Sequence, residues 1–429
     1  MDFVIKGVRV FSGGSISEEL WNVGVQGGRV AMVSRELPQG LDAPSYDGQG
    51  GVLVAGMVDI HCHLREPGFE WREDLRSGSA AGAAGGFTCL VAMPNTDPPV
   101  DVPSGVEHLA LKGSSLEGAR VVPAGCVSKG RRGEEMAELL KMVEAGAVLF
   151  TDDGAPVRSS SLLRLALMYL RGTGVRVMEH PEDTSLSKGG QVHEGRISAL
   201  SGLKGIPSAS EDLAVMRAIE LARETRGAVH LTHLSSKRSV DLVRRAKAEG
   251  VDVTCDVTAH HLTFCEEDVM VSGYSGAFKV NPPLRSQEDR EALWAALADG
   301  TVDAIATDHA PWHLDEKDLP FQEASFGIAS LECAVPAVID GALKRGVRLE
   351  RVLDALSVSP RRIASLPPVA IREGDPADMT LLDLQMVARV DCRSWRSKCR
   401  FSPFDGAVLK GWPVMTVVGG RLSWEAQDR

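Results

Sequence analysis

Two histidines, His61 and His63, lie two residues apart at the end of an apolar run, within the stretch Asp59-Ile60-His61-Cys62-His63. Such a run is typical of a buried parallel strand, whose side chains alternate between its two faces. We therefore expect both imidazoles to point the same way and Cys62 to point into packing. Two imidazoles on one face can bind a single metal ion, although a histidine pair also has structural uses. Arg65, just beyond them, could bind an anionic group of a substrate.

The elements that must position these residues repeat along the chain. Between about residues 56 and 366, apolar strand-like runs alternate with segments of helical periodicity rich in Ala, Glu and Leu. We expect strands at residues 57–63, 87–93, 120–127, 147–151, 175–179, 228–233, 251–257 and 302–307. This alternation predicts an α/β fold, a (β/α)8 TIM-like barrel. A doubly wound sheet is the alternative, but the number and regular spacing of the units favour a closed barrel.

Both ends of the chain depart from this repeat. Residues 3–11 and 22–34 are strand-like, and we expect further strands in the tail at residues 378–382, 407–409, 414–418 and 421–423. Gly419-Gly420 is typical of a tight hairpin turn. Neither end is long enough to build a core alone, so we expect one small β-sandwich formed from both termini. The predicted division is therefore 1–55 and 367–429 for the sandwich and 56–366 for the catalytic barrel.

Polar residues collect where the expected barrel strands end, and barrels of this kind keep their active sites at that face. The candidates are His61, His63, Asp152, Asp153, His180, His233 and Asp308. Only one of the two neighbouring aspartates can face inward on a strand. Imidazoles with a shared carboxylate suit zinc, and two zinc ions can share a hydroxide that attacks an amide-like carbonyl. The aspartate of the last strand could take up the proton and pass it to a leaving nitrogen.

Composition narrows the class of protein. The chain has 429 residues, of which 44% are hydrophobic, and a formal charge of −11, which argues against a broad nucleic-acid surface. No apolar run is long enough to span a bilayer, and the N-terminal residues lack the pattern of a secretory leader. The eight cysteines are scattered without a Cys-x-x-Cys motif, so we expect reduced core residues of a cytoplasmic protein.

The chain resembles the dihydroorotases of the amidohydrolase superfamily over nearly its whole length. The matching segments are residues 59–68, 93–99, 128–130, 150–154, 179–182, 232–236, 279–285, 307–311, 326–327 and 373–378. The resemblance implies a metal-dependent hydrolase barrel and the reversible ring closure of N-carbamoyl-L-aspartate to L-dihydroorotate, a step of pyrimidine biosynthesis. It also implies one or two zinc ions per subunit.

The resemblance also assigns roles by position. The implied zinc ligands are His61, His63 and Asp308 at the first ion, His180 and His233 at the second, and Asp153 between the two. Asp308 is the implied general acid and base. The implied substrate-binding residues are His63, Arg65, Asn95, Asn281, Phe326 and Gly327, with Arg65 and Asn95 at the α-carboxylate. Many relatives bridge their metals with a carboxylated lysine. An aspartate there resembles one bacterial branch of dihydroorotases and weighs against hydantoinase and allantoinase.

One departure from the family pattern concerns the substrate carboxylate. The family usually has Asp-His-Ala-Pro-His, whose last histidine helps to bind that carboxylate, but this chain reads Asp308-His309-Ala310-Pro311-Trp312-His313. Either His313 substitutes through a shifted loop, or the indole N–H of Trp312 makes the contact, or the contact is absent. We expect weaker substrate binding, and a change of specificity to another cyclic ureide is the alternative.

The remaining histidines have structural interpretations. We expect His260 and His261 to form supporting hydrogen bonds, His230 to face the surrounding helices, and His309 to point away from the metals. Residues 311–323 are our candidate for a loop that closes over the site. A symmetric homodimer is the default expectation. The function class that competes with an enzyme is a weakly active or non-catalytic partner of aspartate transcarbamoylase.

Overall fold

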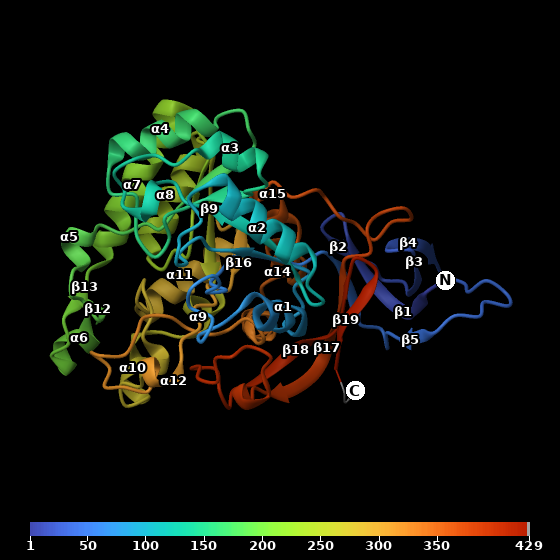
Figure 1. Ribbon diagram of the computed structural model, residues 1–429. Helices are drawn as coiled ribbons and strands as arrows, with labels where there is room; N and C mark the ends of the chain where they lie inside the picture. The colour runs from blue at the N-terminus through green and yellow to red at the C-terminus, as the bar shows by residue number, and fades with distance from the viewer. Residues whose placement is uncertain (427–429) are drawn as a thin grey trace.

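The computed structural model describes residues 1–426, and its larger part is a barrel of parallel strands (Figure 1). Its eight strands follow one another in chain order around the sheet: β7 (Val58–Cys62), β8 (Cys89–Ala92), β9 (Arg120–Gly125), β10 (Leu149–Phe150), β11 (Arg176–Glu179), β14 (Val229–Leu231), β15 (Val253–Thr258) and β16 (Ala304–Ala306). The barrel is closed where Cys62 bridges His309 in parallel and the His63 N–H donates to the His309 carbonyl at 2.8 Å. The predicted (β/α)8 barrel is confirmed.

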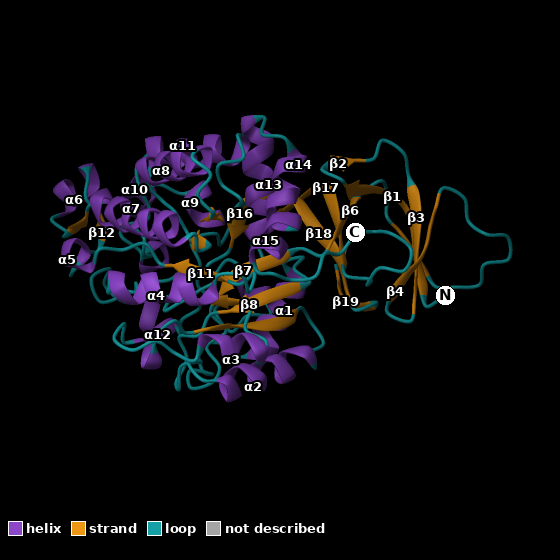
Figure 2. Ribbon diagram, turned by 90° about the horizontal axis from the view of Figure 1, so that it is seen from above, coloured by secondary structure: helices purple, strands orange, loops and turns teal. Residues whose placement is uncertain are grey.

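Helices surround this barrel, as the view from above shows (Figure 2). The main ones are α1 (Leu75–Ala84), α2 (Pro103–Ser114), α3 (Leu139–Glu144), α4 (Ser160–Leu170), α7 (Ser208–Thr225), α8 (Lys237–Ala248), α11 (Gln287–Ala298), α13 (Ala334–Arg345), α14 (Leu349–Leu356) and α15 (Val358–Ile363). The starts of α1 and α11 have a local cause, since the Asp74 and Ser286 side chains accept from their first turns. Outward strand residues such as Leu231 and Val257 pack with helix residues such as Val215 in one core cluster.

Short elements occupy the loops that leave the barrel. After β11 come α5 (Thr184–Ser187), β12 (Val192–His193), α6 (Arg196–Ser201) and β13 (Gly205–Ile206); later come α9 (Ala259–Thr263), α10 (Glu266–Val271) and α12 (Leu314–Lys317). Single 3-10 turns span Lys129–Arg131, Gly276–Phe278 and Cys392–Ser394. The β12–β13 pair was not predicted, because a strand of two residues carries no periodic signal.

The second part is a nine-stranded sheet that both termini build together. Its strands are β1 (Phe3–Ser12), β2 (Ser15–Ile16), β3 (Trp21–Gln26), β4 (Arg29–Ser34), β5 (Ser45–Asp47), β6 (Val52–Ala55), β17 (Met379–Arg389), β18 (Val408–Val418) and β19 (Arg421–Glu425). The two ends of the chain meet where β6 pairs antiparallel with β17, Val54 opposite Thr380. Figure 1 shows N and C on this side of the molecule. A β-rich unit formed from both termini is therefore confirmed.

Details of this terminal sheet refine the expectation. The predicted strands at 407–409 and 414–418 are one continuous strand, β18, whose register shifts against β17. Gly419 and Gly420 form the predicted hairpin turn with φ of +56° and +78°, a conformation that glycine adopts without steric cost.

Two further expectations concern the whole chain. All eight cysteines are buried with free thiols, as predicted for core residues. Within residues 1–426, no helix combines the length and apolar character that crossing a membrane requires.

Candidate metal centre and active site

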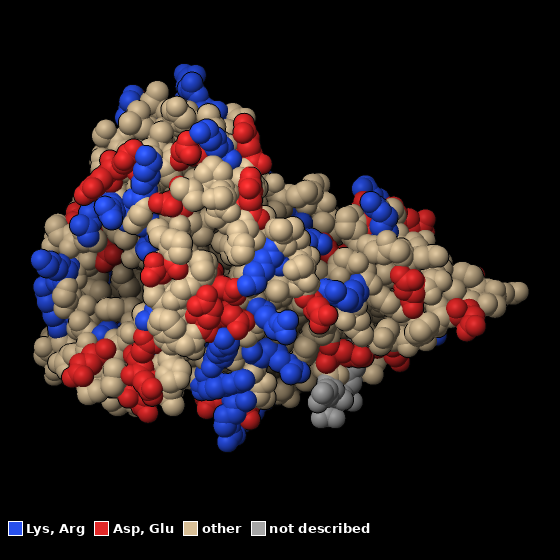
Figure 3. Space-filling model, viewed as in Figure 1, with Lys and Arg blue, Asp and Glu red and all other residues tan. Residues whose placement is uncertain are grey.

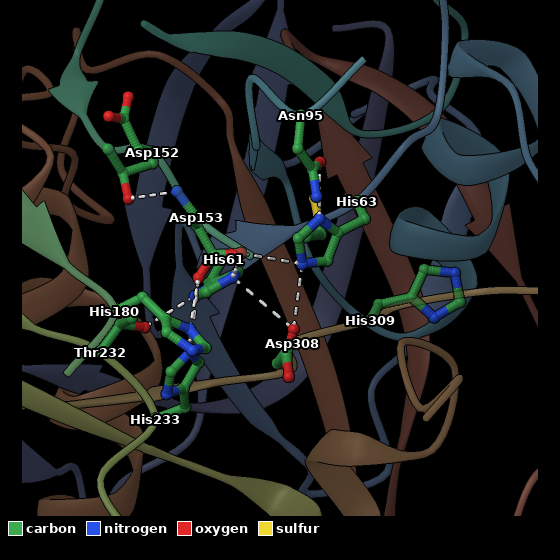
Figure 4. A network of polar contacts seen from close by, with 12 residues as sticks. His61, His63, Asn95, Asp152, Asp153, His180, Thr232, His233, Asp308 and His309 are labelled. Atoms are coloured by element: carbon green, nitrogen blue, oxygen red, sulfur yellow. Dashed lines mark hydrogen bonds and ion pairs between the residues drawn. The ribbon is translucent and has the colours of Figure 1, made fainter. Parts of the chain in front are cut away.

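All six predicted metal ligands lie together at the carboxyl ends of the barrel strands, and each is at least nine-tenths buried (Figure 4). They come from the ends of β7, β10, β11, β14 and β16, so their convergence follows from the closed barrel. Two groups have ligand atoms close enough to hold one ion each: His61 with His63 and Asp308, and His61 with Asp153 and His233. The fold thus gathers residues from segments more than 240 positions apart.

Asp153 lies at the centre of this cluster and faces two pairs of histidines. Its Oδ2 is 3.3 Å from His61 Nε2 and 3.4 Å from His63 Nε2. Its Oδ1 is 3.3 Å from His180 Nδ1 and 3.4 Å from His233 Nε2. One carboxylate oxygen for each pair is the geometry of a bridge between two neighbouring ions.

Asp308 contacts the first pair of histidines, His61 and His63. Its Oδ1 lies 3.1 Å from His63 Nε2 and 3.6 Å from His61 Nε2. Both His233 and Asp308 have a φ of +42°, a backbone conformation that few residues other than glycine adopt. This unusual backbone lets the chain turn each side chain into the cluster directly after its strand.

The far side of three imidazoles is occupied by hydrogen bonds that set their tautomers. His63 Nδ1 donates to Asn95 Oδ1 at 2.9 Å, and His180 Nε2 lies 3.2 Å from the Glu182 carboxylate. Thr232 gives its hydroxyl proton to Asp256 at 2.9 Å, so it accepts from His61 Nδ1 at 2.7 Å. Each neutral ring therefore turns an unprotonated nitrogen toward the cluster, as a metal ligand requires.

His61 Nε2 supplies a direct test of whether this cluster fits a metal. The atom is buried and has no hydrogen bond within residues 1–426. A buried nitrogen without a hydrogen bond is costly unless something else satisfies it. An ion held by imidazole nitrogens and carboxylate oxygens would do so, and this donor set is the one zinc prefers. The residues present fit a metal centre.

The electrostatics of the cluster favour positive charge. Burial opposes protonation of His61, but Asp153 and Asp308 outweigh it and raise its pKa to about 9. Burial also opposes protonation of His180, and contacts with Asp153 and Glu182 raise its pKa to about 10. Despite burial, the neighbouring histidines hold the pKa of Asp153 well below its ordinary value. Buried anions of this kind require cations beside them.

A cavity of about 390 Å³ opens above the cluster. Figure 3 shows the molecule hollowed on the side that carries β12 and β13. All six predicted substrate-binding residues line the cavity: His63, Arg65, Asn95, Asn281, Phe326 and Gly327. Its size suits a small molecule. The structure brings the substrate-binding candidates to the same place as the metal ligands, while His61 lies beneath them.

Sequence reasoning missed three basic or aromatic residues of this cavity. Arg72, Arg131 and Phe69 also line it. Arg131 donates to the backbone carbonyls of Asp152 and Asp153, the latter at 2.7 Å, and so helps to position Asp153. The signal available was a cluster of charges just after β9, in the segment that also carries the family match at 128–130.

The structure shows whether His313 or Trp312 takes the place of the histidine that the family usually has at position 312. The His313 side chain is 50% exposed and interacts with Asp315 at the start of α12, so it does not reach the cavity. Trp312 does line the cavity, but its indole N–H donates to the Phe326 carbonyl at 2.8 Å. Neither residue supplies a free donor in place of the family histidine.

Asp152, His309 and His261 make hydrogen bonds around the centre, whereas His260 does not. Asp152 accepts from the backbone N–H groups of Val127 and Ser128, at 3.0 Å each. His309 turns away from the cluster toward Glu73, at 3.3 Å, as predicted. His261 lies 3.0 Å from the Pro282 carbonyl. The expectation for His260 was wrong, because its ring is buried and neither ring nitrogen has a hydrogen bond within residues 1–426.

The expectation for His230 was wrong. Its neighbours Val229 and Leu231 pack toward the helices, and His230 points into the barrel, where Nε2 lies 2.8 Å from Asp256. The prediction counted residues back from His233 as if the strand were regular. The positive φ of His233 breaks this alternation, so both residues face inward.

Comparison with known proteins identifies the family. Residues 50–239 match the family model described as dihydro-orotase-like. The chain is 43% identical over 434 residues to a dihydroorotase of Pelotomaculum thermopropionicum, with 100% of this chain and 99% of the relative covered. A dihydroorotase of Anaeromyxobacter dehalogenans is 42% identical over 422 residues, with 98% of this chain and 97% of that one covered.

Solved structures agree in fold. An L-hydantoinase (dihydropyrimidinase) from Arthrobacter aurescens superposes with a TM-score of 0.87 at 26% sequence identity, covering 98% of this chain and 95% of that one. Because relatives as similar as the two dihydroorotases span the chain from end to end, it belongs to the dihydroorotase family and is an enzyme of the class that hydrolyses cyclic amides.

Proposed function

We propose that this chain is a zinc-dependent dihydroorotase that interconverts N-carbamoyl-L-aspartate and L-dihydroorotate with release or uptake of water, in pyrimidine biosynthesis. The observation that carries the proposal is Asp153, whose two oxygens face two separate histidine pairs beneath a cavity lined with substrate-binding candidates. An aspartate takes this place where hydantoinases and allantoinases are expected to carry a carboxylated lysine.

The ligand set supports two zinc ions. His61, His63 and Asp308 would hold one, His180 and His233 the other, and Asp153 would contact both. Bound zinc would supply a Lewis acid at the scissile carbonyl and activate water at neutral pH. Asn95, Thr232 and Glu182 would keep the imidazoles in the orientation that this requires.

Asp308 is the proposed proton carrier. It lines the cavity, and its Oδ1 is 3.1 Å from His63 Nε2. Burial would raise the pKa of Asp308, but His63 and His61 outweigh this effect and hold the pKa below its ordinary value. The carboxylate is therefore available at neutral pH to take a proton from the attacking water and deliver it to the ring nitrogen.

Arg65 is the proposed anchor for the substrate's carboxylate. Its Nε donates to the Pro311 carbonyl at 3.2 Å, which leaves both terminal nitrogens for an anion. The Asn95 oxygen accepts from His63, and its amide nitrogen makes no hydrogen bond within residues 1–426, so it could also bind the carboxylate. Asn281, Phe326 and Gly327 complete the lining of the cavity.

A second candidate function keeps the metal centre and changes the substrate to another cyclic ureide. Trp312 favours it, because this residue removes a family contact to the carboxylate. So does the structural likeness to an L-hydantoinase. The non-catalytic partner role is disfavoured, because every ligand position is filled.

The decisive experiment measures turnover of L-dihydroorotate and N-carbamoyl-L-aspartate by the zinc-loaded protein, with Asp308→Asn as control. We expect turnover that falls at least about a hundredfold in the variant, the range of a lost general acid and base. Turnover of hydantoin but not of L-dihydroorotate would support the second candidate. Absence of turnover with zinc bound would contradict both.

The domain division 1–55, 56–366 and 367–429 belongs to the same proposal, supported by β6 ending at Ala55 and β7 beginning at Val58. A homodimer is supported by exposed apolar side chains on the packed helices α4 and α7, namely Leu165, Met168, Tyr169, Leu213 and Met216. Sedimentation velocity, alone and with aspartate transcarbamoylase, tests both assemblies. A cytoplasmic location fits the free thiols.

A further inference from the structure

A second arginine, Arg72, shares the cavity wall with Arg65. The guanidinium carbons of Arg72 and Arg65 lie 4.0 and 5.0 Å from the centre of the Trp312 ring. An indole attracts cations placed against its ring and so can hold two of them near each other.

The two arginines of this wall have different partners. Arg72 pairs with Glu316, its Nε lying 3.1 and 3.0 Å from the two carboxylate oxygens and its Nη2 2.5 Å from Oε1. Arg65 is 7% exposed, and within residues 1–426 its side chain has only the Pro311 carbonyl as a hydrogen-bond partner. Arg65 forms no ion pair within residues 1–426, although Asp308, Asp153 and Glu316 are near enough to stabilise its charge. The terminal nitrogens of Arg65 therefore remain open to a substrate anion.

Arg72 has capacity left for that anion. Its Nη1 makes no hydrogen bond within residues 1–426, although its Nε and Nη2 are held by Glu316. Arg131, the other missed arginine, is different because its guanidinium is used by the backbone carbonyls of Asp152 and Asp153. Glu316 is only partly buried, with a side chain 27% exposed, so a substrate carboxylate could compete with it for Arg72.

We propose that Arg72 is a specificity-determining residue that binds, together with Arg65, the ring carboxylate of the substrate, and that Glu316 competes for it. This rests on the proposed function for the identity of the substrate. Arg72 takes over the attraction that the family histidine would supply at Trp312. The site therefore selects ring substrates that carry a carboxylate over uncharged cyclic ureides.

The test compares orotate and uracil, two rings that differ by the carboxylate, as ligands of the zinc-loaded protein in calorimetric titration. We expect Arg72→Gln to weaken orotate binding about tenfold, the loss of one charge-assisted hydrogen bond, and to leave uracil binding unchanged. We expect Glu316→Gln to strengthen orotate binding, because the internal competitor is removed. Arg164→Gln is the matched control, since Arg164 forms the same two-pronged pair with Glu224 on the surface.

Opposite effects of the two variants separate substrate binding from a structural role. If Arg72 only stabilised the loop through Glu316, both variants would weaken both ligands, and the proposal would be overturned. Unchanged orotate binding in Arg72→Gln would overturn it as well. Should Arg72→Gln fail to fold, Glu316→Gln decides alone, and weaker or unchanged orotate binding there would exclude competition for Arg72.

Kinetics give an independent measurement. Arg72→Gln should raise KM for L-dihydroorotate about tenfold and change kcat little, because the lost contact lies away from the reacting bond. Arg72→Lys should restore part of the affinity by restoring the charge. The two proposals can fail separately. If the wild-type protein shows no turnover but still binds orotate through Arg72, the proposed function is wrong and this inference still holds.

Discussion

At the scale of single residues, the centre depends on side chains that never contact a metal. Thr232, Asn95 and Glu182 each hold the outer nitrogen of one imidazole, so the inner nitrogen is the one with a free lone pair. Thr232 is in turn fixed by Asp256, which also accepts the His233 N–H at 2.7 Å. One buried aspartate therefore orients two ligands from different strands.

Replacing Thr232 by Val removes the acceptor of His61 Nδ1 while keeping the side-chain shape. We expect zinc affinity to fall about 10–100-fold, the usual effect of losing such a partner, with the fold intact. Competition with a chelator of known affinity measures it. Thr263→Val is the control, because among the described residues that hydroxyl donates only to the Ala259 carbonyl within α9. Equal zinc affinities for wild type and Thr232→Val would contradict the orienting role.

At the scale of elements, the segment after β16 forms a wall of the cavity and is fastened by a buried lysine. Lys317 donates to the carbonyls of Lys279, Ser325 and Gly327 at 3.1, 2.9 and 2.7 Å. The Gly327 N–H donates to Lys279 as well, at 2.9 Å. The backbone of the Phe326–Gly327 wall is thus held on both sides, which suits a preformed surface for substrate more than a mobile lid.

The same lysine makes stability depend on pH. Burial lowers the pKa of Lys317 to about 7, whereas an unfolded lysine keeps its proton to about pH 10. Between these values the unfolded chain binds more protons, so unfolding free energy rises with pH, by at most about 1.4 kcal/mol per unit from this group.

Lys317→Met should remove that contribution, as urea unfolding at pH 7 and 8.5 would reveal. Lys237→Met, at an exposed ion pair with Glu288, should retain the wild-type pH dependence. If wild type and Lys317→Met gained stability in parallel over this range, the assignment to Lys317 would be wrong.

At the scale of the whole molecule, the terminal sheet is joined to the barrel through the end of α1. Thr380 on β17 donates to the Gly86 carbonyl at 2.6 Å, and Thr416 on β18 donates to the Ala83 carbonyl at 2.8 Å. Both threonines are fully buried. The two parts therefore share an interface that is tied by specific hydrogen bonds as well as by apolar packing.

Thr380→Val should destabilise the protein by about 1–3 kcal/mol, because it leaves a buried carbonyl without a donor. Thr416→Val is the matched control with a smaller expected loss, since Ala83 also accepts from the Gly86 N–H at 3.1 Å. Thermal unfolding of the zinc-loaded variants measures both. Equal losses of stability in the two variants would show that the hydrogen bond to Gly86 contributes no more than the one to Ala83.

The sequence by itself determined the barrel, the terminal sheet and the cluster of ligands. Buried parallel strands are continuous apolar runs, and the polar residue that ends each run must lie at the same rim once the barrel closes. His61, His63, Asp153 and Asp308 could therefore be placed from strand ends and family resemblance together. Their meeting within hydrogen-bonding range follows from that closure.

Only the tertiary structure decided which irregular segments meet. Loop conformation decides three features: the inward turn of His230, the pairing of Arg72 with Glu316, and the position of His313 outside the cavity. Sequence periodicity reports the local backbone of regular elements, whereas loops take their path from packing against distant segments. Arg72 and Glu316 are 244 residues apart, and no local sequence pattern predicts that their side chains pair.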